Sequence, residues 1–112
     1  MRYVLQVVLS NAQHPEYGQA TIPFPIPNQN YDSTIELLGP LKIGDTLRQD
    51  CQVDELDSFY TVLNTLIGTQ VTLDELDYLA KRLDSFDDGE AAQFQGMAHK
   101  LGLSEIKDLI NL

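Results

Sequence analysis

The sequence is poor in basic residues and has neither tryptophan nor a basic run. Only 7 of its 112 residues are Lys or Arg, against 17 Asp or Glu, so the formal net charge is −10. Proteins that bind nucleic acid directly neutralise phosphates with Lys and Arg. The shortage disfavours nucleic acid as a direct ligand and favours a basic protein as the partner. Acidity that serves solubility alone is the competing explanation.

Cysteine and long apolar runs are also scarce. Cys51 is the only cysteine, which excludes an internal disulfide and any thiolate metal cluster built from one chain. No window approaches the roughly 20 apolar residues that span a bilayer. The stretch 1–10 is apolar but lacks the long apolar core and cleavage site of a signal peptide. These features predict a cytoplasmic protein with no membrane segment.

Motifs that carry catalysis are missing. There is no glycine-rich phosphate loop, no Gly-x-Ser-x-Gly and no His-Glu-x-x-His. Cys51, His14 and His99 could in principle supply a nucleophile and a base, but Asp50 and Asp54 flank the cysteine and disfavour its thiolate. We expect a buried or strand cysteine, two surface histidines, no enzyme and no cofactor. A small hydrolase is the most distant alternative.

The run from Asp84 to Gly89 superficially resembles a calcium-binding loop, in which oxygen ligands precede a glycine at the sixth position. However, Phe86 occupies the third position, and Gln95 stands where a bidentate Glu is required. We therefore expect no metal site here.

The first half of the chain predicts strands. Val, Leu and Tyr are nearly continuous over 3–9, a loop follows over 11–18, and a second extended run covers 19–26. A third run is predicted over 46–56, after a turn at Gly44-Asp45. The second run is expected at a sheet edge because prolines cannot donate ladder hydrogen bonds, and it contains Pro23, Pro25 and Pro27.

The spacing of apolar residues predicts helices elsewhere. A short helix that carries Ile35, Leu37 and Leu38 is expected after Tyr31, capped by Asp32 or Ser33 and ended by Gly39-Pro40. A second helix is expected from Ser58 to Gly68, and a third begins at the capping box Thr72-Leu73-Asp74-Glu75. A fourth helix ends at Gly102, and a last one begins at Ser104. The residues expected inward are, helix by helix, Ile35, Leu37 and Leu38; Phe59, Val62, Leu63, Leu66 and Ile67; Leu73, Leu76, Leu79, Ala80, Leu83 and Phe86; Ala91, Phe94, Met97, Ala98 and Leu101; Ile106, Leu109 and Ile110.

Strands followed by helices predict an α+β fold. We expect a small antiparallel sheet from the N-terminal half, followed by a cluster of three to four short helices. The predicted parts are a strand-rich α+β subdomain over 1–57 and an acidic helical subdomain over 58–112, which share a core or form one compact unit.

The negative charge is concentrated between Asp50 and Glu90. Eleven carboxylates lie there against only Lys81 and Arg82, and eleven minus two leaves nine net negative charges in 41 residues. On the helix that follows Thr72, the acids lie off the apolar stripe and are expected to face water. The candidate partner-binding residues are Asp50, Asp54, Glu55, Asp57, Asp74, Glu75, Asp77, Asp84, Asp87, Asp88 and Glu90.

Two interpretations compete for these acids. Carboxylates in a first helical turn stabilise the helix by about 0.3 to 1 kcal/mol, which explains Asp74, Glu75, Asp88 and Glu90. That explanation does not cover the acids before the first long helix, nor Asp84 near a helix end. Carboxylates one turn apart stand about 5 to 6 Å from each other, comparable with successive phosphates on a DNA strand. Such a surface can occupy a basic DNA-binding groove.

The segment from Thr72 to Leu112 resembles the ArdA family of antirestriction proteins. The pattern is Thr72-Leu73-Asp74-Glu75-Leu76-Asp77-Tyr78-Leu79-Ala80-Lys81-Arg82-Leu83, followed by Glu90, Phe94 and the closing Asp108-Leu109-Ile110-Asn111-Leu112. Its sharpest part is Leu-x-Glu-Leu-x-Tyr-Leu-Ala, and the N-terminal part is similar in layout only. The resemblance implies an elongated, often homodimeric protein of a phage or mobile element. Its acidic surface would mimic bent B-form DNA, without a cofactor, in the groove of a type I restriction-modification enzyme.

Members of that family commonly continue into a further C-terminal domain associated with dimerisation, which we expect to be absent here because the chain ends at Leu112. The leading expectation is inhibition of a type I restriction-modification enzyme by DNA mimicry. The alternative is an acidic interaction or regulatory module of a mobile element, with an unrelated basic partner.

Overall fold

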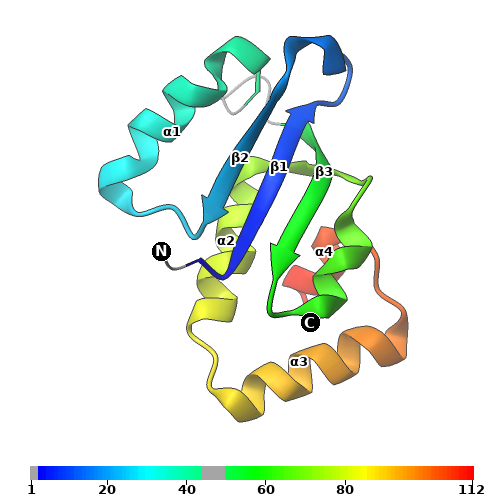
Figure 1. Cartoon of the computed structure of the whole chain (residues 1–112). Coiled ribbons are helices and arrows are strands. Elements are labelled where there is room, and N and C mark those ends of the chain that lie inside the picture. The colour runs from blue at the N-terminus through cyan, green and yellow to red at the C-terminus, as the bar shows by residue number, and fades with distance from the viewer. Residues whose placement is uncertain (1–2, 44–49) are drawn as a thin grey trace.

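Four strands form one antiparallel sheet in the computed structural model, which describes residues 3–43 and 50–112 (Figure 1). They are β1 (Leu5–Asn11), β2 (Gln19–Phe24), β3 (Asp50–Ser58) and β4 (Gln70–Thr72), in the order β2-β1-β3-β4. The predicted α+β class is confirmed. The predicted turn at Gly44-Asp45 and the start of the third run lie outside the described residues. Strand β4 was not predicted, because three residues are too few for a recognisable pattern.

The sheet has one covered face and one open face. Leu5, Val7 and Leu9 of β1 are completely buried, whereas the intervening Gln6 and Val8 are partly exposed. Successive strand residues point to opposite faces, so the core lies on one side only. The proline-containing β2 forms an edge of the sheet, as predicted.

A register shift in β3 determines which face of the sheet its acidic side chains project from. Leu9 pairs with Val53 and Val8 pairs with Glu55, so Asp54 is an extra residue in β3. Beyond the shift, Glu55 lies opposite Val8 and Asp57 opposite Gln6, which are open-face residues. Directly opposed residues point to the same face, so Glu55 and Asp57 project from the open face of the sheet.

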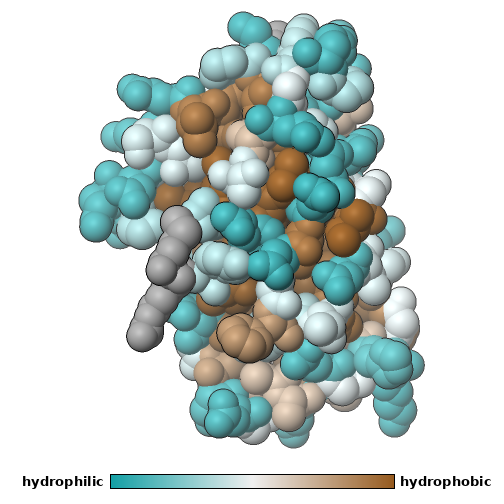
Figure 2. All heavy atoms as spheres, in the orientation of Figure 1, coloured by the Kyte–Doolittle hydropathy of each residue, from teal (hydrophilic) through white to brown (hydrophobic). Residues whose placement is uncertain are grey.

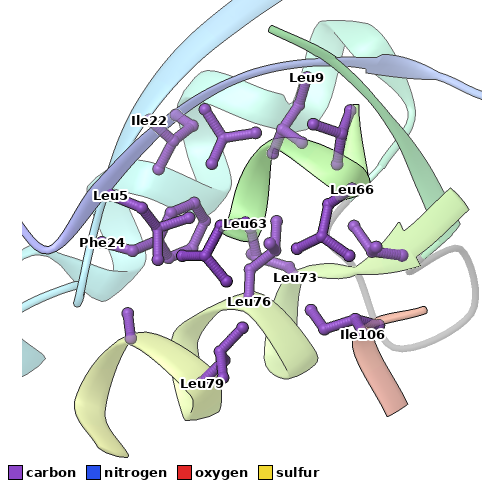
Figure 3. Packing of buried hydrophobic residues seen from close by; sticks show 14 of the residues in the cluster. Leu5, Leu9, Ile22, Phe24, Leu63, Leu66, Leu73, Leu76, Leu79 and Ile106 are labelled. Atoms are coloured by element: carbon purple, nitrogen blue, oxygen red, sulfur yellow. The ribbon is translucent and has the colours of Figure 1, made fainter. Parts of the chain in front are cut away.

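Helices cover the other face. Helix α2 (Leu73–Asp84) lies behind the strands in Figure 1, whereas α1 (Tyr31–Leu38) lies beside the β2 edge and α3 (Asp88–Leu101) below the sheet. The last helix is α4 (Ile106–Ile110), which packs on α2. Leucines of α2 meet the buried side chains of β1 and β2 in one core, which also includes residues of α4 (Figure 3). Within the described chain, no helix is long and apolar enough to cross a membrane. Short 3-10 helices are η1 (Pro15–Tyr17), η2 (Asn28–Asn30), η3 (Gly39–Leu41) and η4 (Thr61–Leu66).

The predicted capping box begins α2. The Thr72 hydroxyl accepts a hydrogen bond from the Glu75 main-chain N–H at 3.1 Å, and a Glu75 carboxylate oxygen accepts one from the Thr72 N–H at 2.9 Å. The box satisfies two main-chain donors that the first helical turn otherwise leaves without partners. Glu75 therefore has a structural role independent of any partner.

We expect Thr72→Ala to lower the free energy of unfolding by about 1 kcal/mol, because it removes this cap. Glu75→Gln should change it by only a few tenths of a kcal/mol, since Gln can also complete a capping box. Urea denaturation followed by circular dichroism measures both. An equal loss in the two variants would show that the Glu75 charge, not its hydrogen bond, stabilises the helix.

The predicted long helix from Ser58 to Gly68 is wrong. Strand β3 continues to Ser58, which pairs with Leu5, and only the short η4 follows. Leu63 and Leu66, three residues apart, are buried as a 3-10 helix allows. Phe59 and Ile67, expected inward, are exposed by 94% and 45%.

Several boundary and burial predictions also need correction. The N-cap residue of α1 is Asn30, and that of α4 is Glu105. Leu37, Met97 and Leu101, predicted inward, are each about half exposed. Helix α3 meets the core through a narrow stripe, chiefly Phe94 and Ala98, which leaves its remaining apolar residues at the surface.

Candidate functional site

Five of the predicted acids lie along one surface, which we call the acidic strip: Asp54, Glu55, Asp57, Asp84 and Asp88. The first three come from β3, and the other two flank the junction of α2 and α3. The part of the strip on β3 and the part at the α2–α3 junction meet at one groove, which Asp57 and Asp84 line together. Burial, and after it the carboxylates of Asp84 and Asp88, raise the pKa of Tyr60, just beyond β3. The fold thus joins acids that are about 30 residues apart in sequence.

Two acids of the strip are held by hydrogen bonds from uncharged groups. Asp54 accepts from the side-chain amides of Gln19, at 2.9 Å, and Gln52, at 3.1 Å. The Tyr3 hydroxyl donates to Asp57 at 2.5 Å. A carboxylate has about four acceptor positions, so these bonds orient the acids and leave them negative with acceptor capacity for a partner.

The two basic residues within the acidic span each contact other groups of the same chain. The Lys81 ammonium lies 2.7 Å from a carboxylate oxygen of Asp77. The Arg82 guanidinium donates to the main-chain oxygens of Ile110 and Leu112, and so ties α2 to the end of the chain. Neither cation is directed at the acidic strip by these contacts, so the strip keeps its negative charge.

Asp77 was predicted to face water, and this prediction is wrong. Asp77 is buried, and its carboxylate accepts a hydrogen bond from the Ile26 main-chain N–H at 2.8 Å. The residue links α2 to the segment after β2 and is paired with Lys81. The burial of Asp77 could not be predicted from the apolar pattern, because the segment after β2 covers the side of α2 next to its apolar stripe.

The remaining predicted acids are not counted in the acidic strip, because they lie at a distance from it, form a helix cap or have a side chain that is not described. Asp74 begins α2 and accepts a bond from the Tyr31 hydroxyl at 3.1 Å; it stands about 15 Å from Asp84 along the helix axis, at 1.5 Å per residue. Asp87 and Glu90 form a second capping box, which begins α3. Both are exposed and flank Asp88. Asp50 begins β3 opposite Thr72, and its side chain lies outside the described part.

Three tyrosines that lie near carboxylates have raised pKa values. The hydrogen bond to Asp57 raises the pKa of Tyr3. Burial and then Asp74 raise the pKa of Tyr31, and burial followed by Asp84 and Asp88 raises that of Tyr60. A negative charge nearby disfavours a phenolate. The folded state therefore holds these protons more tightly than the unfolded chain, so their contribution to stability is complete below about pH 10 and is lost as pH rises through the folded pKa.

We expect Asp57→Asn to lower the pKa of Tyr3 towards about 10, because the variant removes both the charge and the ionic hydrogen-bond acceptor. NMR titration of the chain with carbon-13-labelled tyrosine rings measures this directly. Glu55→Gln is the matched control and should leave Tyr3 unchanged. An unaltered Tyr3 titration in Asp57→Asn would contradict the assigned hydrogen bond.

The groove between the two parts of the strip contains residues that were not predicted from the sequence. It has a volume of about 930 Å³ and is lined by Tyr3, Val4, Pro25, Pro27, Asp57, Ser58, Phe59 and Asp84. The missed residues are chiefly Tyr3 and Phe59. The signal available for Phe59 was its place directly after a strand, but the apolar spacing favoured a helix instead.

The other residues considered for chemistry lie apart. Cys51 is buried in β3, where its thiol contacts the Val71 main-chain oxygen at 3.4 Å. His14 and His99 are both exposed, and His14 stacks on Tyr17 and lies 3.1 Å from Glu16. In the described ranges, no three His, Cys, Asp or Glu side chains gather so that they could hold a metal ion.

Comparison with protein-family models, with curated proteins and with solved structures found no match for this chain.

Proposed function

We propose that the protein is a DNA mimic that inhibits a type I restriction-modification enzyme by occupying its basic DNA-binding groove. The observation that carries the proposal is the acidic strip, whose carboxylates face outward, while the two cations in the same span, Lys81 and Arg82, contact other groups of the chain. The likeness of Thr72 to Leu112 to the ArdA family adds support. It also suggests a cytoplasmic protein of a mobile element, which often acts as a homodimer.

The spacing of the acids is compatible with mimicry. Glu55 and Asp57 lie two residues apart on one face of β3, which corresponds to about 6.6 Å at 3.3 Å per residue. The molecule measures 40 × 29 × 22 Å. Ten net charges over 40 Å give one per 4 Å, whereas duplex DNA carries about one per 1.7 Å. One copy therefore has less than half the charge density of DNA.

This difference in charge density has two consequences. Binding to the DNA groove cannot rest on net charge alone and requires well-placed contacts. Apolar surface is available for them, because hydrophilic and hydrophobic residues are interspersed on the open face of the sheet (Figure 2). Exposed charges are screened by salt, so the affinity of the protein for the enzyme should fall as ionic strength rises, and that of DNA, with its higher charge density, should fall more steeply.

Displacement of DNA tests the proposal. A purified type I methyltransferase is loaded with a fluorescent duplex that contains its recognition site, and the protein is added while the anisotropy of the duplex is recorded. We expect the anisotropy to fall to that of free DNA as the protein is added. Undiminished DNA binding in the presence of excess protein would contradict the proposal and would leave an acidic module with an unrelated basic partner.

A further inference from the structure

Phe59 is unusual because it is almost fully exposed beside two acids. Ser58 explains its position: its hydroxyl donates to the Val4 main-chain oxygen at 2.7 Å and accepts from the Tyr60 N–H at 3.1 Å. This turn directs Tyr60 inward, where its ring lies 6.0 Å from that of Phe94, and leaves Phe59 94% exposed. The Phe59 ring is thus held outside the core by a defined turn.

The groove beside Phe59 combines apolar walls with negative charge. Val4, Pro25 and Pro27 supply apolar surface, and Asp57 and Asp84 supply the carboxylates. Both acids are exposed, and no basic residue is among the described side chains that line the groove. Tyr3 donates to one oxygen of Asp57, which leaves the other oxygen available to a donor. The charge of the groove is therefore complementary to a cation that also has a flat or apolar surface.

We propose that this groove binds an arginine side chain of the partner protein. A guanidinium can donate to the carboxylates of Asp57 and Asp84 through its five N–H groups and can stack on the Phe59 ring. Lysine fits less well, because its ammonium is a compact, strongly hydrated charge without a flat face. This inference rests on the proposed function only in that the partner contacts the acidic strip. It adds that one arginine side chain of the partner is anchored in the groove.

Titration of the full chain with short basic peptides tests the inference. The probes are Ac-Gly-Arg-Gly-Arg-Gly-NH2 and its lysine counterpart, followed by NMR of the protein amides at 0.15 M salt. We expect saturable shifts centred on Ser58, Phe59 and Asp84, with tighter binding of the arginine peptide. Shifts spread evenly over all acidic residues, or equal binding of both peptides, would overturn the inference.

Matched variants separate the ring from the charge. Phe59→Ala keeps the net charge and should weaken arginine-peptide binding about two- to fivefold, the range for an exposed cation–π contact. Leu37→Ala removes another exposed apolar side chain, which lies on α1 away from the groove, and should change nothing. Asp57→Asn with Asp84→Asn should weaken binding about tenfold. Unchanged melting temperatures would show that the variants fold.

The outcomes for the two proposals are distinguishable. If Phe59→Ala binds the peptide as well as the parent while the protein still displaces DNA, the arginine site is wrong and mimicry stands. If the peptide binds at the groove with the expected preference but DNA is never displaced, mimicry is wrong and the groove serves another arginine-bearing partner.

Discussion

Replacing Asp77 by Ala is expected to lower the free energy of unfolding by about 2 to 3 kcal/mol. The substitution leaves the Ile26 N–H without its acceptor in the interior, and an unsatisfied buried donor costs about 1 to 3 kcal/mol. It also removes the partner of Lys81, but that ammonium is half exposed and can turn to water, so its loss adds little. The main effect comes from the lost hydrogen bond between the Asp77 carboxylate on α2 and the Ile26 main-chain N–H in the segment after β2.

Thermal unfolding measures this effect and separates the two contacts. For a domain of this size, 2 to 3 kcal/mol corresponds to a fall in Tm of at least about 8 °C. Lys81→Gln is the matched control, because it removes the ion pair but keeps the acceptor for Ile26, and it should cost less than about 1 kcal/mol. A large loss in Lys81→Gln with a small one in Asp77→Ala would contradict the assignment.

Neutralising four acids of the strip is expected to weaken inhibition about a hundred- to a thousandfold. The variant combines Glu55→Gln, Asp57→Asn, Asp84→Asn and Asp88→Asn, all at exposed positions. Exposed charge contacts contribute up to about 1 kcal/mol each. Four contacts of about 0.7 to 1 kcal/mol give roughly that fold-change, since 1.4 kcal/mol is a factor of ten.

The matched control removes the same charge elsewhere. It combines Asp32→Asn, Glu36→Gln, Glu105→Gln and Asp108→Asn, which are exposed acids of α1 and of the α4 region. Displacement of DNA from the methyltransferase measures both variants. We expect the control variant to inhibit nearly as well as the parent protein. Equal losses in the two variants would show that net charge, and no particular surface, governs inhibition.

The strands and the capped helix could be predicted because they depend on local patterns. Alternating or continuous apolar residues marked β1 and β2, and Thr72 with Glu75 marked the start of α2 through side-chain chemistry within four residues. The region after β3 could not be predicted in this way. Phe59 has helical spacing to Val62 and Leu63, but the pairing of Ser58 with Leu5, far away in sequence, extends the strand and turns the ring outward.

The candidate site was predictable in composition but not in arrangement. Charge counting located the acids between Asp50 and Glu90, yet it could not show that Asp77 is buried or that Asp87 and Glu90 serve a cap. Those roles depend on contacts with Ile26 and on where α3 begins. The meeting of Asp57 and Asp84 at one groove likewise requires the antiparallel sheet to be packed on α2.

The most direct test of DNA mimicry is the affinity of the protein for a type I methyltransferase, measured by calorimetry at increasing concentrations of recognition-site duplex. If the protein mimics DNA, the two bind the enzyme mutually exclusively, so the apparent Kd of the protein should rise in proportion to the concentration of free duplex. An apparent Kd that stays constant, with protein and DNA bound to the enzyme together, would contradict it.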